Sequence, residues 1–152
     1  IYGIVDVTND EYTEVGTSEE SNFTFTNLNP SWEYDVVVVG FDKNGDACAI
    51  SDSYRFCAAC PPVENFKATI TGNNTISATW DYAVCHGYYI QWSTDPEFKS
   101  DVHGEWINDT FTENYTINTD GSAENYYVRI RCWKYYNDGK IYSDFSAPIL
   151  PE

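Results

Sequence analysis

Five cysteines and two histidines are the residues of this 152-residue chain whose types and spacing could do chemistry. Cys57 and Cys60 are separated by two alanines, a spacing found in redox-active pairs, in half of a metal site and in local structural disulfides. The sequence has neither a second Cys-x-x-Cys nor a βαβ pattern, so we favour a structural disulfide here. Because the number of cysteines is odd, at least one thiol stays free or pairs outside the chain.

The histidines and the acidic residues do not predict an active site. His86 and His103 lie beside predicted loops, and no serine or cysteine is placed to complete a triad with them. The run Asp42-Lys43-Asn44-Gly45-Asp46 has oxygen ligands at alternate positions, as a calcium loop has. It lacks the length and the distal glutamate of an EF-hand loop, and an Asn-Gly turn explains it. We therefore expect no enzyme, no metal and no cofactor.

Charge and hydropathy exclude further classes. The chain has 24 Asp and Glu against 8 Lys and Arg, a net charge of -16, which argues against a protein that binds nucleic-acid phosphates. No run approaches 18 consecutive apolar residues, so we expect no membrane insertion. The chain has no methionine and begins without the pattern of a signal peptide, so we expect it to be part of a longer protein.

The pattern of apolar residues predicts an all-β protein. Period-two alternation recurs between turn residues, and 17% of the residues are aromatic, as is typical of strands. Asn44-Gly45 and Asn137-Asp138-Gly139 predict hairpin turns that need positive φ. The predicted strands are Tyr2–Thr8, Asn22–Asn27, Tyr34–Asp42, Ala47–Phe56, Val63–Thr71, Thr75–Asp81, Gly87–Thr94, Asn114–Thr119, Asn125–Tyr135 and Lys140–Ser146.

The sequence contains an internal repeat. A strand that begins with tyrosine, an Asn/Asp-Gly turn and a Ser-Asp pair follow one another twice at nearly equal spacing, at Tyr34–Val39, Gly45 and Ser51, and again at Tyr126–Arg131, Gly139 and Ser143. Pro61-Pro62 interrupts strand pairing between the copies. We therefore predict two domains, residues 1–60 and residues 61–152, which are both acidic.

The second copy has a recurring set of residues at strand positions: Pro62, Val63 and Phe66 in its first strand, Trp80 at the end of the second, Gly87–Asp95 in the third and Asn125–Arg131 in the sixth. Through these residues it resembles a fibronectin type III module over nearly all of residues 61–152. The first copy is similar to the later half of such a module through Leu28-Asn29-Pro30 and Tyr34, the position of the family's tyrosine corner. The second copy departs from this pattern with Asp120-Gly121-Ser122, which weakens the corner at Tyr126.

The resemblance implies tandem immunoglobulin-like β-sandwiches of fibronectin type III topology, similar to modules of bacterial secreted and surface proteins. The first module would lack its first two strands. These strands would precede residue 1 in a longer chain, which we favour, or another chain would supply them by strand addition, a route to self-association.

The resemblance also implies a pairing of cysteines. In the family's pattern Cys132 points into the core at the far end of the sixth strand, and Cys85 lies in the loop at that same end. We therefore predict a Cys85–Cys132 disulfide, with two buried free thiols as the alternative. Cys48 would pair with a residue of the absent strands. Disulfides in a module of this kind indicate an oxidising compartment.

Tyr142-Ser143-Asp144-Phe145-Ser146 resembles a degenerate form of the Trp-Ser-x-Trp-Ser box of cytokine receptors, in which arginines stack between aromatic rings. A ladder of Arg129 and Arg131 against Tyr142 and Phe145 is therefore expected. It would either stiffen the sheet or form a binding face for sugars or peptides, made of Tyr89, Tyr127, Arg129, Arg131, Trp133, Tyr142 and Phe145.

The resemblance implies a non-catalytic spacer or adhesion module of a larger secreted or cell-surface protein, with a protein or glycan partner that the sequence does not name. One alternative is a receptor ectodomain that binds a protein at the elbow around Tyr54–Val63. Another is a carbohydrate-binding accessory of a glycoside hydrolase, in which Trp106, Trp133 and Tyr136 would be exposed and coplanar. Sequons for N-glycosylation begin at Asn22, Asn73, Asn108 and Asn114.

Overall fold

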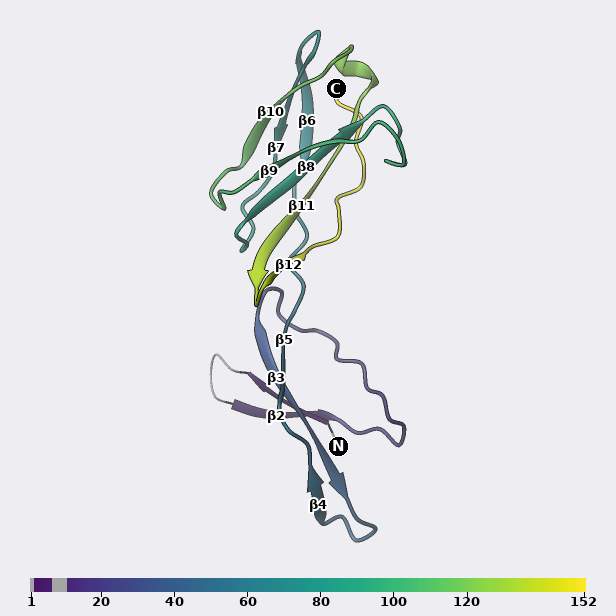
Figure 1. The fold of residues 1–152 in the computed structure, drawn as a ribbon, viewed down its shortest axis with the longest axis vertical. Coiled ribbons are helices and arrows are strands. Elements are labelled where there is room, and N and C mark those ends of the chain that lie inside the picture. Colours follow the sequence, from purple (N-terminus) through teal and green to yellow (C-terminus); the bar gives the residue numbers. More distant parts are fainter. Residues whose placement is uncertain (1, 7–10) are drawn as a thin grey trace. The chain divides into compact units, whose positions relative to one another are not determined.

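The computed structural model describes residues 2–6 and 11–152 and divides the chain into two compact units, Ile1–Ala58 and Ala59–Glu152 (Figure 1). Both units are built from antiparallel strands, and the second also has a short 3-10 helix, η1 (Ala123–Asn125). The division falls two residues before the predicted boundary after residue 60, because Cys60 packs in the core of the second unit.

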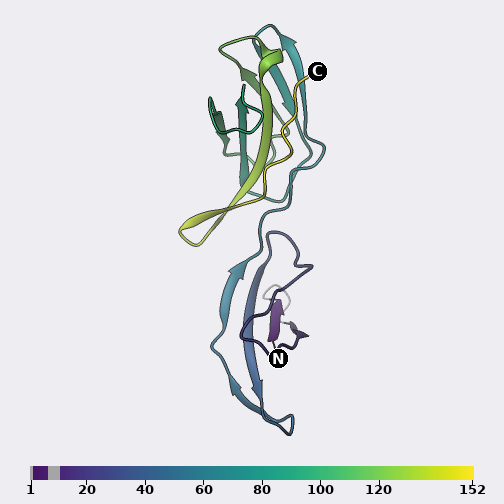
Figure 2. The same ribbon diagram turned by 90° about the vertical axis from the view of Figure 1, so that its right-hand side faces the viewer.

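The second unit contains two sheets (Figure 2). The three-stranded sheet has the order β10-β7-β6 and is made of β6 (Lys67–Gly72), β7 (Thr75–Thr79) and β10 (Asn114–Asn118). The four-stranded sheet has the order β12-β11-β8-β9 and is made of β8 (Gly87–Ser93), β9 (His103–Ile107), β11 (Tyr127–Tyr136) and β12 (Gly139–Tyr142). Counted within the unit, the first, second and fifth strands form one sheet, and the third, fourth, sixth and seventh form the other.

The core of this unit lies between its two sheets. Strand β7 buries Ile76 and Ala78 completely, and β11 buries Val128 and Ile130, since alternate residues of a strand point to one face. The Trp80 and Tyr88 rings pack with their centroids 5.2 Å apart. The Tyr88 hydroxyl accepts a hydrogen bond from the Ala83 amide at 3.0 Å and so holds the loop before β8.

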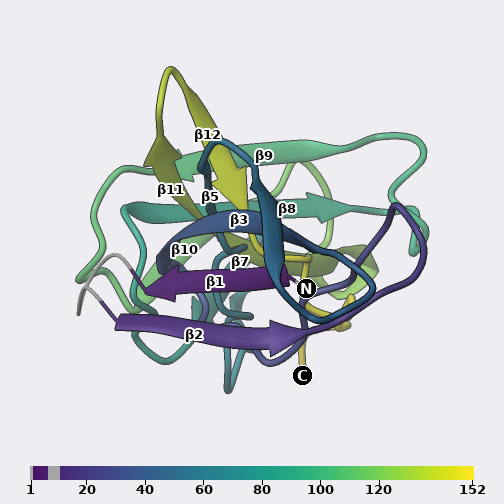
Figure 3. The same ribbon diagram turned by 90° about the horizontal axis from the view of Figure 1, so that it is seen from below.

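The first unit contains one sheet, of order β2-β1-β3-β4, with β5 also paired to β3. Its strands are β1 (Tyr2–Asp6), β2 (Glu11–Gly16), β3 (Glu33–Phe41), β4 (Ala47–Ile50) and β5 (Tyr54–Cys57). Figure 3 shows β1 and β2 side by side and antiparallel. Strands β4 and β5 pair with the two ends of β3, so together they form one interrupted edge strand. Within the described part of this unit, no second sheet covers this one.

The strand predictions are confirmed for most of the chain, with differences at identifiable places. The predicted strand Asn22–Asn27 is wrong: its alternating Phe23 and Phe25 rings pack at 5.2 Å, but the segment pairs with no described strand. The predictions missed β2 and β9, and they joined β4 to β5. The segments predicted as Val63–Thr71 and Lys140–Ser146 are strands only over Lys67–Gly72 and Gly139–Tyr142. The end of the predicted strand Tyr2–Thr8 lies outside the described residues.

Both predicted hairpins contain a residue with positive φ. Gly45 has φ of 85° and Asn137 has φ of 51°, a region that glycine and asparagine tolerate best. In the first turn, the Asp42 carboxylate accepts the amide hydrogens of Asn44 and Asp46 at 2.8 and 3.0 Å. These bonds lower the pKa of Asp42, the Asp46 amide contributing most. The carboxylate that resembled a calcium ligand therefore serves as the turn's acceptor.

Candidate functional site

Three cations and several aromatic rings interlock on the outer face of the sheet β12-β11-β8-β9. We call this group the cation–aromatic stack; it consists of Arg129, Arg131, Lys140, Tyr89, Phe98, Trp106, Trp133, Tyr142 and Phe145. Its cations come from β11 and β12, and its rings from β8, β9, β11, β12 and the segments that follow β8 and β12. The stack therefore joins every strand of the four-stranded sheet.

Arg129 occupies one end of the stack. Its guanidinium lies 4.0 Å from the centroids of both the Phe98 and the Phe145 rings. Its Nε and Nη2 donate hydrogen bonds to the Gln91 side-chain oxygen at 2.9 and 2.7 Å. Burial, and then the nearby charge of Arg131, lower the pKa of Arg129. The residue nevertheless stays charged at neutral pH, as arginine does in proteins.

Arg131 lies in the middle of the stack. Its guanidinium is 4.0 Å from the Tyr142 ring centroid and 4.5 Å from that of Phe145. The Tyr89 ring is farther, at 5.6 Å. The Arg131 Nε is buried and has no hydrogen-bond partner, so the attraction of the rings is the main compensation for its desolvation. The predicted contacts of Arg131 with Tyr142 and Phe145 are therefore present.

Lys140 extends the stack in a way that the sequence did not predict. Its ammonium lies 4.0 Å from the Trp106 ring centroid and 3.9 Å from that of Trp133. Trp106 in turn stacks on Tyr89 at 4.2 Å. Trp133 was expected to face outward with the arginines, but it is only 2% exposed because these side chains cover it. A coplanar platform of Trp106, Trp133 and Tyr136 is also wrong, since the two indoles lie at 76° to each other.

Two serines fix the segment that carries the box aromatics. The Ser143 hydroxyl accepts the Cys132 amide hydrogen at 3.1 Å, and the Ser146 hydroxyl accepts that of Ile130 at 3.1 Å. The Ser143 and Ser146 amides donate to the carbonyls of the same two residues. Side chains thus replace part of the backbone ladder along β11. This arrangement sets Tyr142 and Phe145 against Arg131.

Strand register explains which members of the stack the sequence missed. Arg129 is paired with Gln91 and Arg131 with Tyr89 in the β8–β11 ladder, so the cross-strand neighbours could have been found once the register was known. Phe98 lies in the loop after β8, Trp106 on β9 and Lys140 on β12. Nothing in the sequence around these three residues indicates that they contact the arginines of β11. Tyr127, a predicted face residue, is half-buried at the start of β11 opposite Ser93.

Cys85 and Cys132 are buried free thiols, which was the alternative prediction, and Cys60 joins them in the same core. None of the five is joined in a disulfide, and all lie among the described residues, so neither Cys85–Cys132 nor Cys57–Cys60 is bonded. Cys60, Cys85 and Cys132 meet in the core of the second unit. Cys57 lies on β5, where its thiol donates to the Ala58 carbonyl at 3.4 Å. Cys48 is exposed on β4, and its thiol donates to the Gly40 carbonyl at 3.5 Å.

Both histidines have structural contacts. His86 Nδ1 accepts the Tyr135 amide hydrogen at 3.0 Å and so joins the loop before β8 to β11. His103 stacks on Trp92, with the ring centroids 5.9 Å apart, and its Nε2 lies 3.2 Å from an Asp101 carboxylate oxygen. Among residues 2–6 and 11–152, no group of three or more His, Cys, Asp or Glu side chains is arranged to hold a metal ion.

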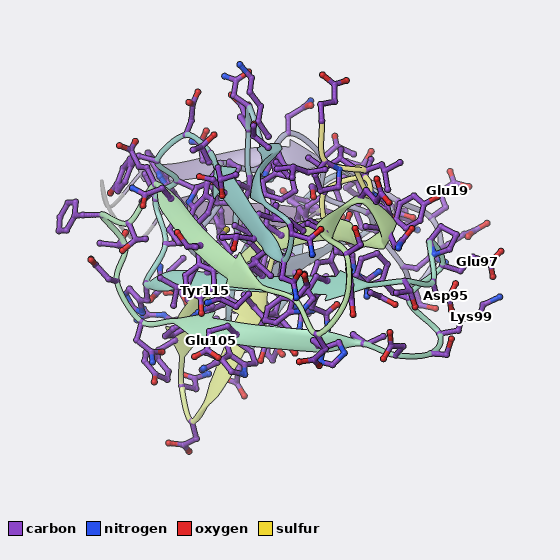
Figure 4. The ribbon with its side chains drawn as sticks, turned by 90° about the horizontal axis from the view of Figure 1, so that it is seen from above. Glu19, Asp95, Glu97, Lys99, Glu105 and Tyr115 are labelled. Carbon is purple, nitrogen blue, oxygen red and sulfur yellow. The ribbon has the colours of Figure 1, made fainter. Side chains whose placement is uncertain are left out.

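The carboxylates of the second unit shape loops and strand edges. Asp95 accepts the amide hydrogens of Glu97, Lys99 and Ser100, and the first of these bonds contributes most to lowering its pKa. Figure 4 shows Asp95, Glu97 and Lys99 together on this loop, where Glu97 and Lys99 form an ion pair.

Figure 4 also places Glu105 on β9 near Tyr115 on β10. Burial, and then the charge of Glu105, raise the pKa of Tyr115. The sequon asparagines Asn22, Asn73, Asn108 and Asn114 are all exposed.

Tyrosine contacts distinguish the two repeats. Tyr34 is buried, and its hydroxyl accepts the Asn29 amide hydrogen at 2.8 Å, which is the contact expected of a tyrosine corner. The corresponding Tyr126 is also buried. Its ring edge and hydroxyl oxygen lie 3.8 Å from the point where a Cβ atom would stand at Gly121, so the ring packs against this glycine.

No protein-family model matches the chain, and no curated protein matches it. Among solved structures, it is similar to the FN1–FN3 domains of chicken CNTN1, with 16% identity and a TM-score of 0.48 over 97% of this chain and 51% of that one. The FN5 domain of Drosophila Lar is 19% identical, with a TM-score of 0.42 over 59% of this chain and 95% of that one. The chain thus spans about half the length of the CNTN1 chain.

The strand order itself defines the fold. The sheets β10-β7-β6 and β12-β11-β8-β9 have the arrangement of a fibronectin type III module, and β2-β1-β3 with β4 and β5 repeats the second of these sheets in the first unit. Among the described residues, no helix is long and apolar enough to cross a membrane. The predicted all-β fold of fibronectin type III topology is therefore confirmed.

Proposed function

We propose that this chain is a non-catalytic spacer and adhesion segment of a larger secreted or cell-surface protein. The observation that carries the proposal is the cation–aromatic stack. It covers the outer face of the four-stranded sheet with side chains of the sheet and of the segments that follow β8 and β12, and it links all four strands through contacts of 3.9 to 5.6 Å. Because the side chains of the stack contact one another across the strands, they stiffen the sheet. Few of their aromatic rings remain accessible for a ligand to stack on.

The path of the chain through the second unit also fits a spacer. The chain enters near Pro61, whose carbonyl accepts the Cys132 thiol toward the far end of β11. It leaves near Ile149, which pairs with Val128 at the start of β11, and then beside Ile70 on β6. The segment at Pro61 and the segment at Ile149 therefore lie beside different parts of β11, the first toward its end and the second at its start. A unit with this arrangement separates the parts of the protein that it connects.

The side chains of the second unit support a structural role. Both histidines and Asp95 serve strand or loop contacts. A hollow of about 490 Å³ beside the β6 edge is lined by both apolar and polar residues, namely Phe66, Ala68, Ile149 and Leu150 with Lys67, Thr69 and Glu152. The net charge of -16 disfavours nucleic-acid partners. We propose that the partner is a protein or glycan surface. A ligand site at Tyr54–Val63 stays a prediction.

Single-molecule force spectroscopy tests the spacer role. The full chain would be pulled between two reference domains, as the parent protein, as Arg131→Met and as Arg55→Met. Arg131 stacks on three rings, whereas Arg55 pairs with Asp35 in the other unit. We expect Arg131→Met to lower the unfolding force of the second unit, and Arg55→Met to leave that event unchanged.

The proposal would be contradicted if Arg131→Met left the unfolding force unchanged. Tryptophan fluorescence during titration with soluble xylan and β-glucan provides the second readout. A saturable change in the parent protein that Arg131→Met abolished would make the stack a carbohydrate site instead of a stiffening element.

A further inference from the structure

Three of the five cysteines meet in the core of the second unit, and the spacer role uses none of them. Cys132 lies on β11, Cys85 in the loop that leads into β8, and Cys60 in the segment that begins the unit. The Cys132 thiol is within hydrogen-bonding reach of both the Cys85 and the Cys60 thiols. Cys132 therefore has two neighbours of the same chemical type and can form a disulfide with only one of them at a time.

Backbone contacts hold each of these cysteines in place. The Cys132 thiol donates to the Pro61 carbonyl at 3.1 Å, which fixes the residue next to Cys60. The Cys60 thiol donates to the Ile141 carbonyl on β12 at 3.7 Å. The His86 amide donates to the Trp133 carbonyl at 2.8 Å, which holds the loop of Cys85 along β11. The cluster is thus built by four separate segments of the unit.

The three thiols differ in exposure and in acidity. Cys132 is fully buried, whereas Cys60 is 5% and Cys85 is 8% exposed, so Cys85 is nearest to solvent. When Cys85 is ionised, the Cys132 thiol can turn its single hydrogen from the Pro61 carbonyl to the Cys85 sulfur, and this hydrogen bond lowers the pKa of the Cys85 thiol to about 6. Hydrogen bonding with Cys60 and then with Cys85, together with burial, raises the pKa of Cys132. The thiolate is the attacking form, and Cys85 is the most exposed of the three thiols and is more acidic than Cys132, which lies beside it.

We propose that Cys60, Cys85 and Cys132 form a thiol–disulfide exchange site in which Cys132 is bonded either to Cys85 or to Cys60. The Cys85 thiolate attacks one sulfur of a small disulfide such as glutathione disulfide, forming a mixed disulfide and releasing one glutathione thiolate, which takes up a proton. Cys132 loses its proton and attacks the Cys85 sulfur, which forms Cys85–Cys132 and releases the second glutathione. Two protein thiols are oxidised and one disulfide is reduced to two thiols.

The third thiol gives the site a second oxidised form. Cys60 loses its proton and attacks the Cys132 sulfur, forming Cys60–Cys132 and returning Cys85 as a thiol, without net oxidation. The first form ties the loop before β8 to β11. The second ties the segment that begins the unit to the same strand. In both forms one of the three thiols remains reduced.

The test uses the full chain with Cys48→Ser and Cys57→Ser, so that only the three clustered thiols react. Reduced protein is incubated with glutathione disulfide, quenched with acid, alkylated and mapped by peptide mass spectrometry. We expect one intrachain disulfide and one alkylated cysteine per molecule, with both pairings present. Adding Cys60→Ser should leave only Cys85–Cys132. Adding Cys85→Ser should leave only Cys60–Cys132, formed about tenfold more slowly because the acidic thiol is gone.

Replacement of the shared residue is the decisive comparison. Cys132→Ser keeps a donor for the Pro61 carbonyl, and we expect it to accumulate a stable glutathione adduct on Cys85 without an intrachain disulfide. A Cys60–Cys85 disulfide formed at the parent's rate in this variant would overturn the proposal, as would a parent cluster that stays reduced. Circular dichroism checks folding. If Cys132→Ser does not fold, the Cys60→Ser and Cys85→Ser variants decide, because each must bond its remaining partner to Cys132.

Discussion

The serines that follow the two hairpins make the same three hydrogen bonds in both units. The Ser51 amide donates to the Val38 carbonyl, the Ser51 hydroxyl accepts the Val38 amide hydrogen, and the same hydroxyl donates to the Asp52 carbonyl. Ser143 makes the equivalent three bonds with Cys132 and Asp144. The repeat seen in the sequence is therefore also a repeat of local hydrogen bonding.

The surroundings of these bonds differ greatly between the units. Val38 is 39% exposed, whereas Cys132 is completely buried beneath a second sheet. All residues of β4 are exposed, whereas the central strands of the second unit bury alternate side chains. Local hydrogen bonds thus specify strand pairing in both units. Tyr34 and Val39 are the buried apolar residues of β3, whereas strand residues that are completely buried occur, among the described residues, in the two-sheet unit. We therefore expect the same serine hydrogen bond to contribute more to the free energy of unfolding in the second unit than in the first.

The cations show a corresponding contrast. In the first unit, Arg55 forms two hydrogen bonds with the Asp35 carboxylate, at 2.9 and 2.8 Å, and its side chain is 52% exposed. In the second unit, Arg131 contacts rings and is half-buried. One unit therefore uses its arginine in a solvent-screened ion pair, and the other uses it to hold aromatic side chains together.

The largest difference should come from truncating central-strand residues. Ile130 on β11 is completely buried, so Ile130→Ala should lower the free energy of unfolding by about 2–5 kcal/mol. Val36 on β3 is only half-buried, so Val36→Ala should cost about 1 kcal/mol or less. Urea denaturation followed by hydrogen exchange and peptide mass spectrometry assigns each loss to its unit. If Val36→Ala lowered the free energy of unfolding as much as Ile130→Ala, the core of the first unit would be packed as densely as that of the second.

The paired serines provide a smaller and better matched comparison. Ser143→Ala leaves the buried Cys132 amide without an acceptor, so it should destabilise the second unit by about 1–3 kcal/mol. Ser51→Ala should cost about 0.5 kcal/mol, because water can reach the Val38 amide. The measurement is the urea midpoint of each variant. A loss for Ser51→Ala as large as that for Ser143→Ala would show that exposure does not set the cost.

The stack should contribute less than the core. Arg131→Met keeps an apolar stem but removes the charge that attracts three rings, so we expect a loss of about 1–2 kcal/mol. Arg131→Lys should recover part of this loss. Because the cation is partly shielded from solvent, 1 M NaCl should change the difference little. Thermal unfolding at low and high salt measures it, and a difference that salt removes would mean that the rings contribute little.

The sequence predicted the strands best where one chain segment carries the whole signal. Alternation along β7, β8 and β11 marked residues that the structure buries, and Tyr34 forms the contact that its position predicted. Asn22–Asn27 has the same alternation, but a strand also needs a neighbour, and the described residues supply none. Alternation of apolar residues therefore shows that a segment is able to form a strand. It does not show that a neighbouring strand is present to pair with it.

The candidate sites were predicted only in part, for a related reason. The arginines and box aromatics lie on adjacent segments, so their contacts followed from the pattern. Lys140 and Trp106 meet only through the order of β12, β11, β8 and β9, which depends on the whole sheet. Cys60 likewise reaches Cys132 because the first residues of the unit run back along its core. Such long-range placement has no local signature.

The ion pair of the first unit should give the smallest effect, and one that solution conditions abolish. Hydrogen bonding and then the charge of Arg55 lower the pKa of Asp35, so the pair stabilises the fold above the carboxyl's ordinary pKa of 3.8 and is lost as the pH falls through the lower folded value. Arg55→Met should cost about 0.5 kcal/mol at pH 7 in dilute buffer, as exposed pairs do. The same substitution should cost nothing measurable once Asp35 is protonated, or in 1 M NaCl. Urea midpoints of the parent and Arg55→Met under these three conditions test this, with hydrogen exchange confined to β3 and β5 as the local readout. A loss of stability that persisted in acid and in salt would mean that the apolar stem of Arg55 packs against the sheet. Arg55 would then stabilise its unit partly by packing, as Arg131 does, and the contrast between the two arginines would be smaller than the ion pair and the ring contacts indicate.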